Sequence, residues 1–563
     1  MNAPEPHASN AWLARIEPRD PAGEPAEAAD GPLAGLRFAV KDNINVAGVP
    51  TTAACVGFSH LPRQDATVVA RLKAAGAIAI GKTNLDQFAC GLNGTRSPYG
   101  AVPNAFDPAL ISGGSSSGSA YVVATGEADF SLGTDTAGSG RVPAALNNIV
   151  GLKPTRGLVS ANGVVPAARS VDCVSIFAPT VGLACRVLEA AIGFDAADPF
   201  SRELALADVP IAQRFRFGVP DDVPFFGDTR QAAAWKRSVE QLRELGGTPV
   251  VIDYAPLARA GDLLYGSALL AERHAAIRSF FDAWPGGLIE PVRGIIAEGS
   301  RYGGADVFDA LTELARLARD ARSLWQRIDV LVVPTCPGHL SQAQLLADPV
   351  ALNRRLGHYT SFVNLLDMAA IAIPTCLRED GLPFGVSLIG PAGSDWQLAG
   401  LGQRVHHASG LSQGAGGHPL PPPQPIAGLS QRSQVRVAVV GAHLSGMPLN
   451  AQLTERGARL VETTTTSDAY RLYALAGTRP AKPGLLRLGA RGGAPITLEV
   501  WSMPASAFGG FVALVPPPLA IGSIELADGT WVQGFVCEPS GLEGAEDITH
   551  TGGWRAWLAG SGR

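Results

Sequence analysis

The first two thirds of the chain switch repeatedly between helical and strand periodicity. Between residues 65 and 76, apolar side chains recur at the spacing of one helical face: Val68, Val69, Leu72 and Ala75. An uninterrupted apolar run at residues 77–80 follows directly, and another begins near Phe38 and ends at Lys41. Such runs predict buried strands. Together with frequent glycine turns, they predict an α/β domain.

The last part of the chain has a different pattern. Its runs "VRVAVV", "LVETTTT" and "ITLEVWSM" are rich in β-branched residues and predict a strand-rich domain. Between the two parts lies a stretch of Gly, Pro, Ser and Gln that is typical of a semi-rigid linker. We therefore expect a first domain at residues 1–410, a linker at 411–434 and a second domain at 435–563.

The composition of the chain argues against nucleic acids and membranes as partners. The 563-residue chain has a net charge of -5 and a pI near 6.1, so it has no basic excess to bind nucleic acid or an anionic membrane. Residues 503–524 carry no charge, but their prolines and glycines exclude one continuous membrane helix and predict strands and turns. We expect neither a nucleic acid nor a membrane partner.

Cysteine and histidine spacing predicts no metal site. The seven cysteines are scattered without a C-x-x-C pair, and the ten histidines show no H-x-x-x-H spacing. Unpaired cysteines and the absence of a visible secretory signal at the start of the sequence favour a cytoplasmic setting.

The segment "GAIAIGKT", residues 76–83, matches the phosphate-binding loop pattern. A working loop of this kind follows a strand and opens a helix. Here the predicted helix comes first, and the glycines enclose the predicted strand. We therefore interpret the match as accidental and rank an ATP-binding function last.

Two glycine- and serine-rich segments follow in succession: "ISGGSSSGSAYVVAT" at residues 111–125 and "SLGTDTAGSGRVPAA" at 131–145. Such segments can simply be turns before helices. They also supply what acyl transfer needs, a hydroxyl nucleophile beside exposed backbone N–H groups. Because no histidine lies between His60 and His274, a buried Lys41 is the natural candidate base.

The motifs "AVKDN", "GGSSSGSA" and "GTDTAGSGRVPAA" together resemble the amidase signature family. The resemblance implies an α/β fold with a central mixed sheet flanked by helices, over most of residues 30–410. It also implies a Ser-cisSer-Lys triad in which Ser139 is the nucleophile, Ser115 follows a cis peptide bond and relays the proton, and Lys41 is the base.

The same resemblance implies an oxyanion hole and its supports. The oxyanion would be bound by the backbone N–H groups of Thr136, Ala137, Gly138 and Ser139. Ser116 and Asp135 would hold these loops through hydrogen bonds. No cofactor is implied.

Other motifs resemble the allophanate hydrolase branch of the family, among them "AGSGRVPA", "NNIVGLKPTRG" and "SVDCVSIFA". The resemblance implies that Tyr265 and Arg273 bind the carboxylate of allophanate, although a helix with solvated arginines would show the same residues. It implies hydrolysis of allophanate to ammonia and carbon dioxide after a urea carboxylase, in a cytoplasmic homodimer. The alternatives are a biuret-type, malonamate or general amidase and the amidase-type component of an amidotransferase, which would lack the second domain.

The second domain also resembles the tail of allophanate hydrolases through "GAHLSGMPLNAQL", "GFVCEP" and "DITHTGGWRAWLA". Its opening is similar to γ-glutamylcyclotransferase-like folds. This implies a β-rich α+β domain that acts on N-carboxycarbamate, with His443 and Glu538 as candidate residues. A docking or assembly module remains the alternative.

Overall fold

The computed structural model describes residues 9–16, 30–429, 434–489 and 492–561. It divides into two compact units, Met1–Leu429 and Ser430–Arg563. This boundary falls inside the predicted linker at residues 411–434, and part of that segment packs on the first unit. Ile426 is buried in the core of that unit, and the Gly414 N–H donates to the Asn148 carbonyl.

The first unit is built on a long mixed sheet. β2 pairs in parallel with β3 and β4, whereas β10 pairs antiparallel with β5 and β11. In the order of hydrogen-bonded neighbours, the strands are β1 (Trp12–Arg15), β3 (Ile78–Thr83), β2 (Arg37–Lys41), β4 (Phe130–Asp135), β6 (Cys173–Ala178), β5 (Val150–Lys153), β10 (Met368–Leu377), β11 (Pro383–Pro391), β9 (Val330–Pro334), β7 (Phe215–Pro220) and β8 (Gly247–Ile252).

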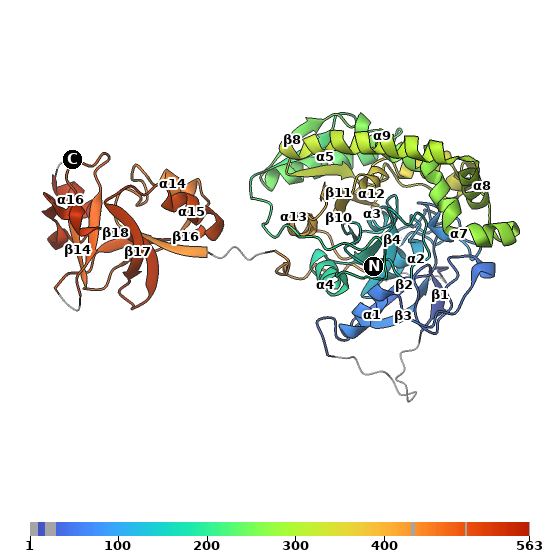
Figure 1. Cartoon of the computed structure of the whole chain (residues 1–563), viewed down its shortest axis with the longest axis horizontal. Coiled ribbons are helices and arrows are strands. Elements are labelled where there is room, and N and C mark those ends of the chain that lie inside the picture. The colour runs from blue at the N-terminus through green and yellow to red at the C-terminus, as the bar shows by residue number, and fades with distance from the viewer. Residues whose placement is uncertain (1–8, 17–29, 430–433, 490–491, 562–563) are drawn as a thin grey trace. The chain divides into compact units, whose positions relative to one another are not determined.

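Helices cover both faces of this sheet (Figure 1). Strand β9 is apolar at every position because both of its faces are buried. Val330 and Val332 pack into one core, and Leu331 and Val333 pack into the other. The first core is closed by α1 (Thr67–Ala74), α4 (Val181–Ala191), α5 (Thr229–Glu244) and α13 (Asp395–Ala408). The opposite face packs against α2 (Ser117–Ala124), α3 (Val142–Leu146), α6 (Ala255–Gly266), α9 (Gly304–Arg322) and α12 (Phe362–Leu365). The unit also contains α7 (Ala271–Ala283), α8 (Val292–Glu298), α10 (Gln342–Ala347) and α11 (Ala351–Leu356).

The second unit is rich in strands, as predicted. One sheet has the order β13 (Arg459–Thr465), β16 (Thr497–Pro504), β12 (Gln434–Val439), β18 (Trp531–Cys537) and β17 (Leu519–Glu525). A smaller sheet contains β15 (Pro483–Arg487), β14 (Tyr470–Ala474) and β19 (Glu546–Asp547), and the helices are α14 (Ala451–Thr454), α15 (Ala505–Val512) and α16 (Trp554–Ser561).

The uncharged stretch at residues 503–524 differs in part from its prediction. It contains the helix α15 between two strands, where strands and turns alone were expected. Pro504 stands just before the helix, where a missing N–H breaks no helical hydrogen bond. In the part of the chain that the structure describes, no helix is both long and apolar enough to cross a membrane.

Most of the phosphate-loop match is a strand, as predicted: β3 covers Ile78–Thr83, against the expected residues 77–80. Helix α1 ends before it, and Gly81 lies in β3 where a Cβ would meet the Ala14 carbonyl oxygen at 2.5 Å. Lys82 is fully buried: its Nζ lies 2.9 Å from Asp42 Oδ1 and donates to Thr51 Oγ1 at 2.8 Å. The Lys82 ammonium group is therefore bound by Asp42 and Thr51 in the interior and cannot contact a phosphate. The phosphate-loop hypothesis is rejected.

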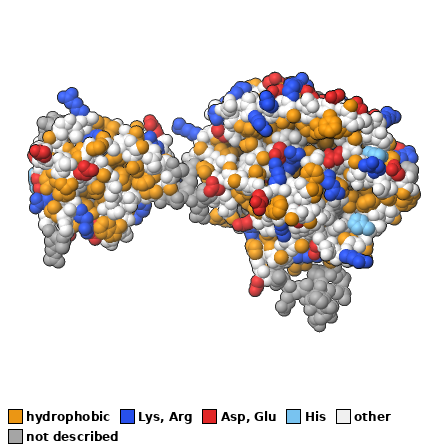
Figure 2. All heavy atoms as spheres, viewed as in Figure 1, with side chains coloured by type: hydrophobic (Ala, Val, Ile, Leu, Met, Phe, Trp, Pro, Cys, Tyr) orange, Lys and Arg blue, Asp and Glu red, His pale blue; other side chains and the backbone are white. Residues whose placement is uncertain are grey.

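Charged side chains are mixed on the face drawn in Figure 2. Lys and Arg lie among Asp and Glu, without a continuous basic area on this face. This arrangement agrees with the slightly acidic balance of the sequence.

We predict that Lys82→Met destabilises the first unit by about 3–5 kcal/mol, because it leaves the Asp42 carboxylate buried and unpaired. The double variant Asp42→Asn/Lys82→Met removes both charges and should recover more than half of this loss. Urea unfolding followed by fluorescence measures both effects. A rise in melting temperature of the wild type with ATP and magnesium would contradict the structural role of Lys82.

Candidate active site

The predicted triad residues lie at or near the carboxyl ends of two neighbouring strands and before a helix that packs on one of them. Lys41 ends β2, and Ser139 lies in the loop between β4 and α3. Ser115 directly precedes the turn into α2, which packs on β4. Because β2 and β4 are parallel neighbours, their carboxyl ends meet at one edge of the sheet.

Lys41 is fully buried and held by hydroxyl groups. Its Nζ lies 2.7 Å from Ser115 Oγ and 2.7 Å from Thr134 Oγ1. Burial lowers the pKa of Lys41 to about 7, against the opposing charges of Asp86, Asp172 and Asp135. An amine with this pKa is half neutral near pH 7, so it can accept a proton.

The serine-rich turn is fixed by backbone contacts. The peptide bond between Gly114 and Ser115 is cis, as the resemblance implies. The Ser115 carbonyl accepts from the Asp86 N–H at 3.0 Å. Ser116 Oγ donates to the Thr134 carbonyl at 3.2 Å, and so connects this turn to β4 beside the Lys41 contact.

Ser139 faces a loop that the sequence did not single out. Its Oγ is 3.4 Å from the Gly91 carbonyl oxygen, in the segment that follows Asp86. The buried Asp86 carboxylate accepts from the Gly94 and Arg96 N–H groups and shapes this loop. A Cβ on Gly91 would meet that carboxylate at 2.3 Å, which explains the glycine.

Asp135 and Arg141 hold the predicted oxyanion loop. Arg141 donates to both Asp135 oxygens at 2.9 Å, and both side chains are fully buried. Although burial raises the pKa of Asp135, the adjacent guanidinium lowers it below the ordinary value, so the carboxylate is charged. Sequence reasoning assigned no role to Arg141.

The predicted oxyanion donors need one correction. The Gly138 N–H donates to Asp135 Oδ1 at 2.8 Å, so the structure uses it internally. The N–H groups of Thr136, Ala137 and Ser139 have no hydrogen-bond partner among the described residues. Three of the four predicted donors therefore stay available for an oxyanion.

Tyr265 and Arg273 meet in the same unit. Arg273 Nη2 donates to the Tyr265 hydroxyl at 3.1 Å, and the guanidinium lies 4.9 Å from the centre of the phenol ring. Arg273 is 3% exposed, yet its Nε and Nη1 have no hydrogen-bond partner among the described residues. A buried guanidinium with unsatisfied donors is a site for an anion.

Asp172 lies between the oxyanion loop and Arg273, and the sequence did not identify it. Its Oδ1 accepts from Thr136 Oγ1 at 2.5 Å. Burial raises the pKa of Asp172 to about 6, and the charge of Arg273 is among the effects that oppose this rise. Asp172 lies within the segment "SVDCVSIFA", which indicated the branch of the family but did not indicate a role for this carboxylate.

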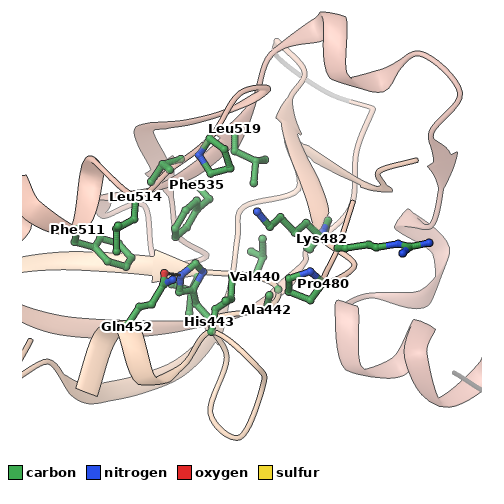
Figure 3. Close-up of a pocket in the computed structure, with 17 residues that line it drawn as sticks. Val440, Ala442, His443, Gln452, Pro480, Lys482, Phe511, Leu514, Leu519 and Phe535 are labelled. Atoms are coloured by element: carbon green, nitrogen blue, oxygen red, sulfur yellow. Dashed lines mark hydrogen bonds between the residues drawn. The ribbon is translucent and has the colours of Figure 1, made fainter. Parts of the chain in front are cut away.

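The two candidate residues of the second unit do not share a site. His443 lines a cavity of about 240 Å³, stacks on Phe535 and has Nε2 2.9 Å from Gln452 Oε1 (Figure 3). Lys482 also lines this cavity (Figure 3). Glu538 follows β18, is exposed and is absent from the lining of this cavity, so its role stays a prediction.

Comparisons with known proteins agree with this arrangement. The family model Amidase matches residues 11–399, and the family model Allophanate hydrolase C-terminal domain matches residues 435–559. The chain therefore belongs to the amidase family, in the branch that carries an allophanate hydrolase C-terminal domain.

Individual relatives support both units. The chain is 44% identical to urea amidolyase of Saccharomyces cerevisiae over 94% of this chain and 30% of that protein. It therefore spans less than a third of that relative's length. The structure of Kluyveromyces lactis allophanate hydrolase matches with a TM-score of 0.81 and 40% identity, over 98% of this chain and 94% of that one.

A third relative matches a smaller part of the chain. It is a component of the glutamyl-tRNA(Gln) amidotransferase of Haloarcula marismortui, 35% identical over 67% of this chain and 96% of its own length. Because the match already covers 96% of that relative, almost none of its sequence is left to form a counterpart of the second unit. The second unit therefore distinguishes the present chain from such amidotransferase components.

We predict that kcat/KM for amide hydrolysis rises with pH and reaches half its maximum near pH 7. Below that pH the Lys41 amine is protonated and cannot accept a proton, whereas above it the neutral amine is present. Initial rates of ammonia release between pH 5 and 9 measure the profile.

Two variants test the same assignment. Lys41→Ala and Ser139→Ala should each remain folded and lose several orders of magnitude in kcat, because base and nucleophile act as a unit. Near-normal turnover by Ser139→Ala would refute the triad.

Proposed function

We propose that this chain is an allophanate hydrolase that uses Ser139, Ser115 and Lys41. The observation that carries the proposal is the buried Arg273 with two unsatisfied donors beside Tyr265. A general amidase has no need of a buried cation, whereas allophanate carries a carboxylate next to its ureido group. The family membership and the K. lactis relative support the same substrate.

The contacts of Arg273 fit a planar carboxylate. Each Nη carries two N–H groups, so the guanidinium can offer the anion a parallel pair of donors, Nε with Nη2 or Nη1 with Nη2, while the other Nη2 N–H stays on the Tyr265 oxygen. Burial raises the pKa of Tyr265, so the phenol keeps its proton and offers it as a further donor. Both residues therefore stabilise the charge that distinguishes allophanate from biuret.

The proposed reaction uses the groups at the strand ends. Neutral Lys41 accepts the proton of Ser139 through Ser115 while the Ser139 oxygen attacks the terminal carboxamide carbon. The N–H groups of Thr136, Ala137 and Ser139 stabilise the oxyanion. Ammonia then leaves with a proton returned from the base, and water cleaves the acyl enzyme to N-carboxycarbamate, which breaks down to carbon dioxide and a second ammonia.

The proposal places this chain after a urea carboxylase, which would supply allophanate. The relative named urea amidolyase supports this link. Neither a metal nor an organic cofactor is required by the proposed steps. A cytoplasmic setting and a homodimer stay predictions from the family resemblance, and malonamate- and biuret-type activities stay the alternatives.

We predict that Arg273→Ala loses about 2–5 kcal/mol of binding and positioning for allophanate. Biuret, which has the same skeleton without the carboxylate, should be hydrolysed as well as before, because the triad is untouched. Ammonia release from both substrates measures the difference.

The conservative variant sharpens this test. Arg273→Lys should recover only part of the loss, since an ammonium group lacks the planar donor pair. An equal loss on allophanate and biuret would make Arg273 structural and would remove the main support for allophanate.

For the second unit, we propose that the His443 cavity binds the N-carboxycarbamate product. The cavity combines an imidazole with the cationic Lys482 and Arg479, which suit a small anion. Burial lowers the pKa of His443, so its ring is neutral at pH 7 and can act as a base. A docking module would not require this combination.

We predict that His443→Gln releases the first ammonia at the normal rate but delays the carbon dioxide formed from each allophanate. Stopped-flow detection of both products measures the delay. The matched control is His550→Gln, which changes an exposed histidine of the same unit. Carbon dioxide formation without delay in His443→Gln would contradict a catalytic role.

A further inference from the structure

The two halves of the proposed site come from segments far apart in the sequence. The nucleophile and the oxyanion donors lie at residues 136–139, whereas Arg273 lies in the first turn of α7. A short substrate must touch both halves at once, because only one nitrogen separates the carboxylate of allophanate from the attacked carbonyl. The distance between the halves therefore decides which substrates react.

One segment, residues 167–172, connects these halves, and we name it the strap. At one end, Asp172 accepts from Thr136 Oγ1 at 2.5 Å and holds the oxyanion loop. The same carboxylate accepts from the N–H groups of Ala167 and Ala168 at 2.8 and 3.1 Å. The strap is thus folded around Asp172.

The strap is held to α7 by Glu272, the residue before Arg273. The Ser170 N–H donates to Glu272 Oε1 at 2.7 Å, and Ser170 Oγ donates to Glu272 Oε2 at 2.7 Å. Both carboxylate oxygens of Glu272 therefore bind one residue of the strap. The Ser170 carbonyl accepts from Arg156 Nη1 at 2.9 Å, which limits its movement further.

Apolar packing joins the same parts. Ala137 of the oxyanion loop, Ala168 and Val171 of the strap and Leu264 of α6 form one buried cluster, with Tyr265 packed against it. The strap is therefore a shared wall between the oxyanion loop and the Tyr265–Arg273 pair.

We infer that Glu272 is a positioning residue that selects substrates by the distance between their carboxylate and the attacked carbonyl. It does so by fixing α7, and with it Arg273, to the strap and thereby to the oxyanion loop. The inference rests on the proposed function, because it takes Arg273 as the group that binds the carboxylate. Glu272 itself contacts the strap and is assigned no contact with substrate.

The test is Glu272→Ala, measured with allophanate and biuret. Loss of both contacts frees α7 from the strap, and a misplacement of about 1 Å costs on the order of 100-fold. We expect KM for allophanate to rise roughly 10- to 100-fold by this argument. Single-turnover hydrolysis of biuret, with enzyme in excess, should change by less than about twofold, since Arg273 does not contribute to it.

A second measurement reports length selection directly. Malonate and succinate, two dicarboxylates that differ by one methylene, are compared as inhibitors of allophanate hydrolysis. The wild type should prefer the shorter malonate, and Glu272→Ala should lose most of this preference. Glu272→Gln should recover part of it, because the amide oxygen still accepts one hydrogen bond from Ser170.

The matched control is Asp282→Asn, which removes an exposed carboxylate from the same helix. It should leave KM, biuret hydrolysis and the inhibitor preference unchanged. An equal loss on allophanate and biuret, or an unchanged inhibitor preference in Glu272→Ala, would overturn the inference. If Arg273→Ala separates the two substrates while Glu272→Ala does not, only this inference fails and the proposed function stands.

Discussion

The burial of one amine underlies the rest of the site. Lys41 can act as a base near neutral pH only because the protein surrounds it and offers it hydroxyl groups in place of water. Three aspartates nearby favour the charged form, so the arrangement is a balance between desolvation and attraction. The sheet fixes the position of Lys41 in this environment, because β2 pairs with β4 and so ends beside the loop that carries Ser139.

Two of the buried carboxylates in the first unit are held in ion pairs. Asp135 is matched by Arg141, and Asp42 by Lys82, in both cases with both side chains removed from solvent. Such pairs add little net stability but are costly to break. Arg273 departs from this pattern, because its hydrogen-bonded neighbour is a phenol and its Nε and Nη1 have no partner in the part of the chain that the structure describes. That departure supports the proposed role of Arg273 in binding the substrate carboxylate.

The sequence predicts those parts of the fold and of the candidate site in which residue types recur in a pattern. Helix α1, strand β3 and the strand ending at Lys41 follow from apolar periodicity, and the serine-rich turns follow from glycine placement. Asp86, Asp172 and Glu272 were not identifiable, because each acts on backbone groups that come close only in the folded chain. That Glu538 lies outside the lining of the His443 cavity was also not predictable, since its place after a strand does not reveal which way its side chain turns. The position of the boundary between the units depended on the packing of single apolar residues such as Ile426.

The proposed catalytic serines and the largest apolar core of the first unit lie on opposite faces of the long sheet. The loops bearing Ser115 and Ser139 lead into α2 and α3, whereas α1, α4, α5 and α13 close the core on the other face. An engineer who wishes to make the enzyme more durable can therefore work on this second face. The core cluster there contains none of the proposed catalytic residues, so volume-conserving changes in it should raise stability without the loss of activity that stabilising changes often cause.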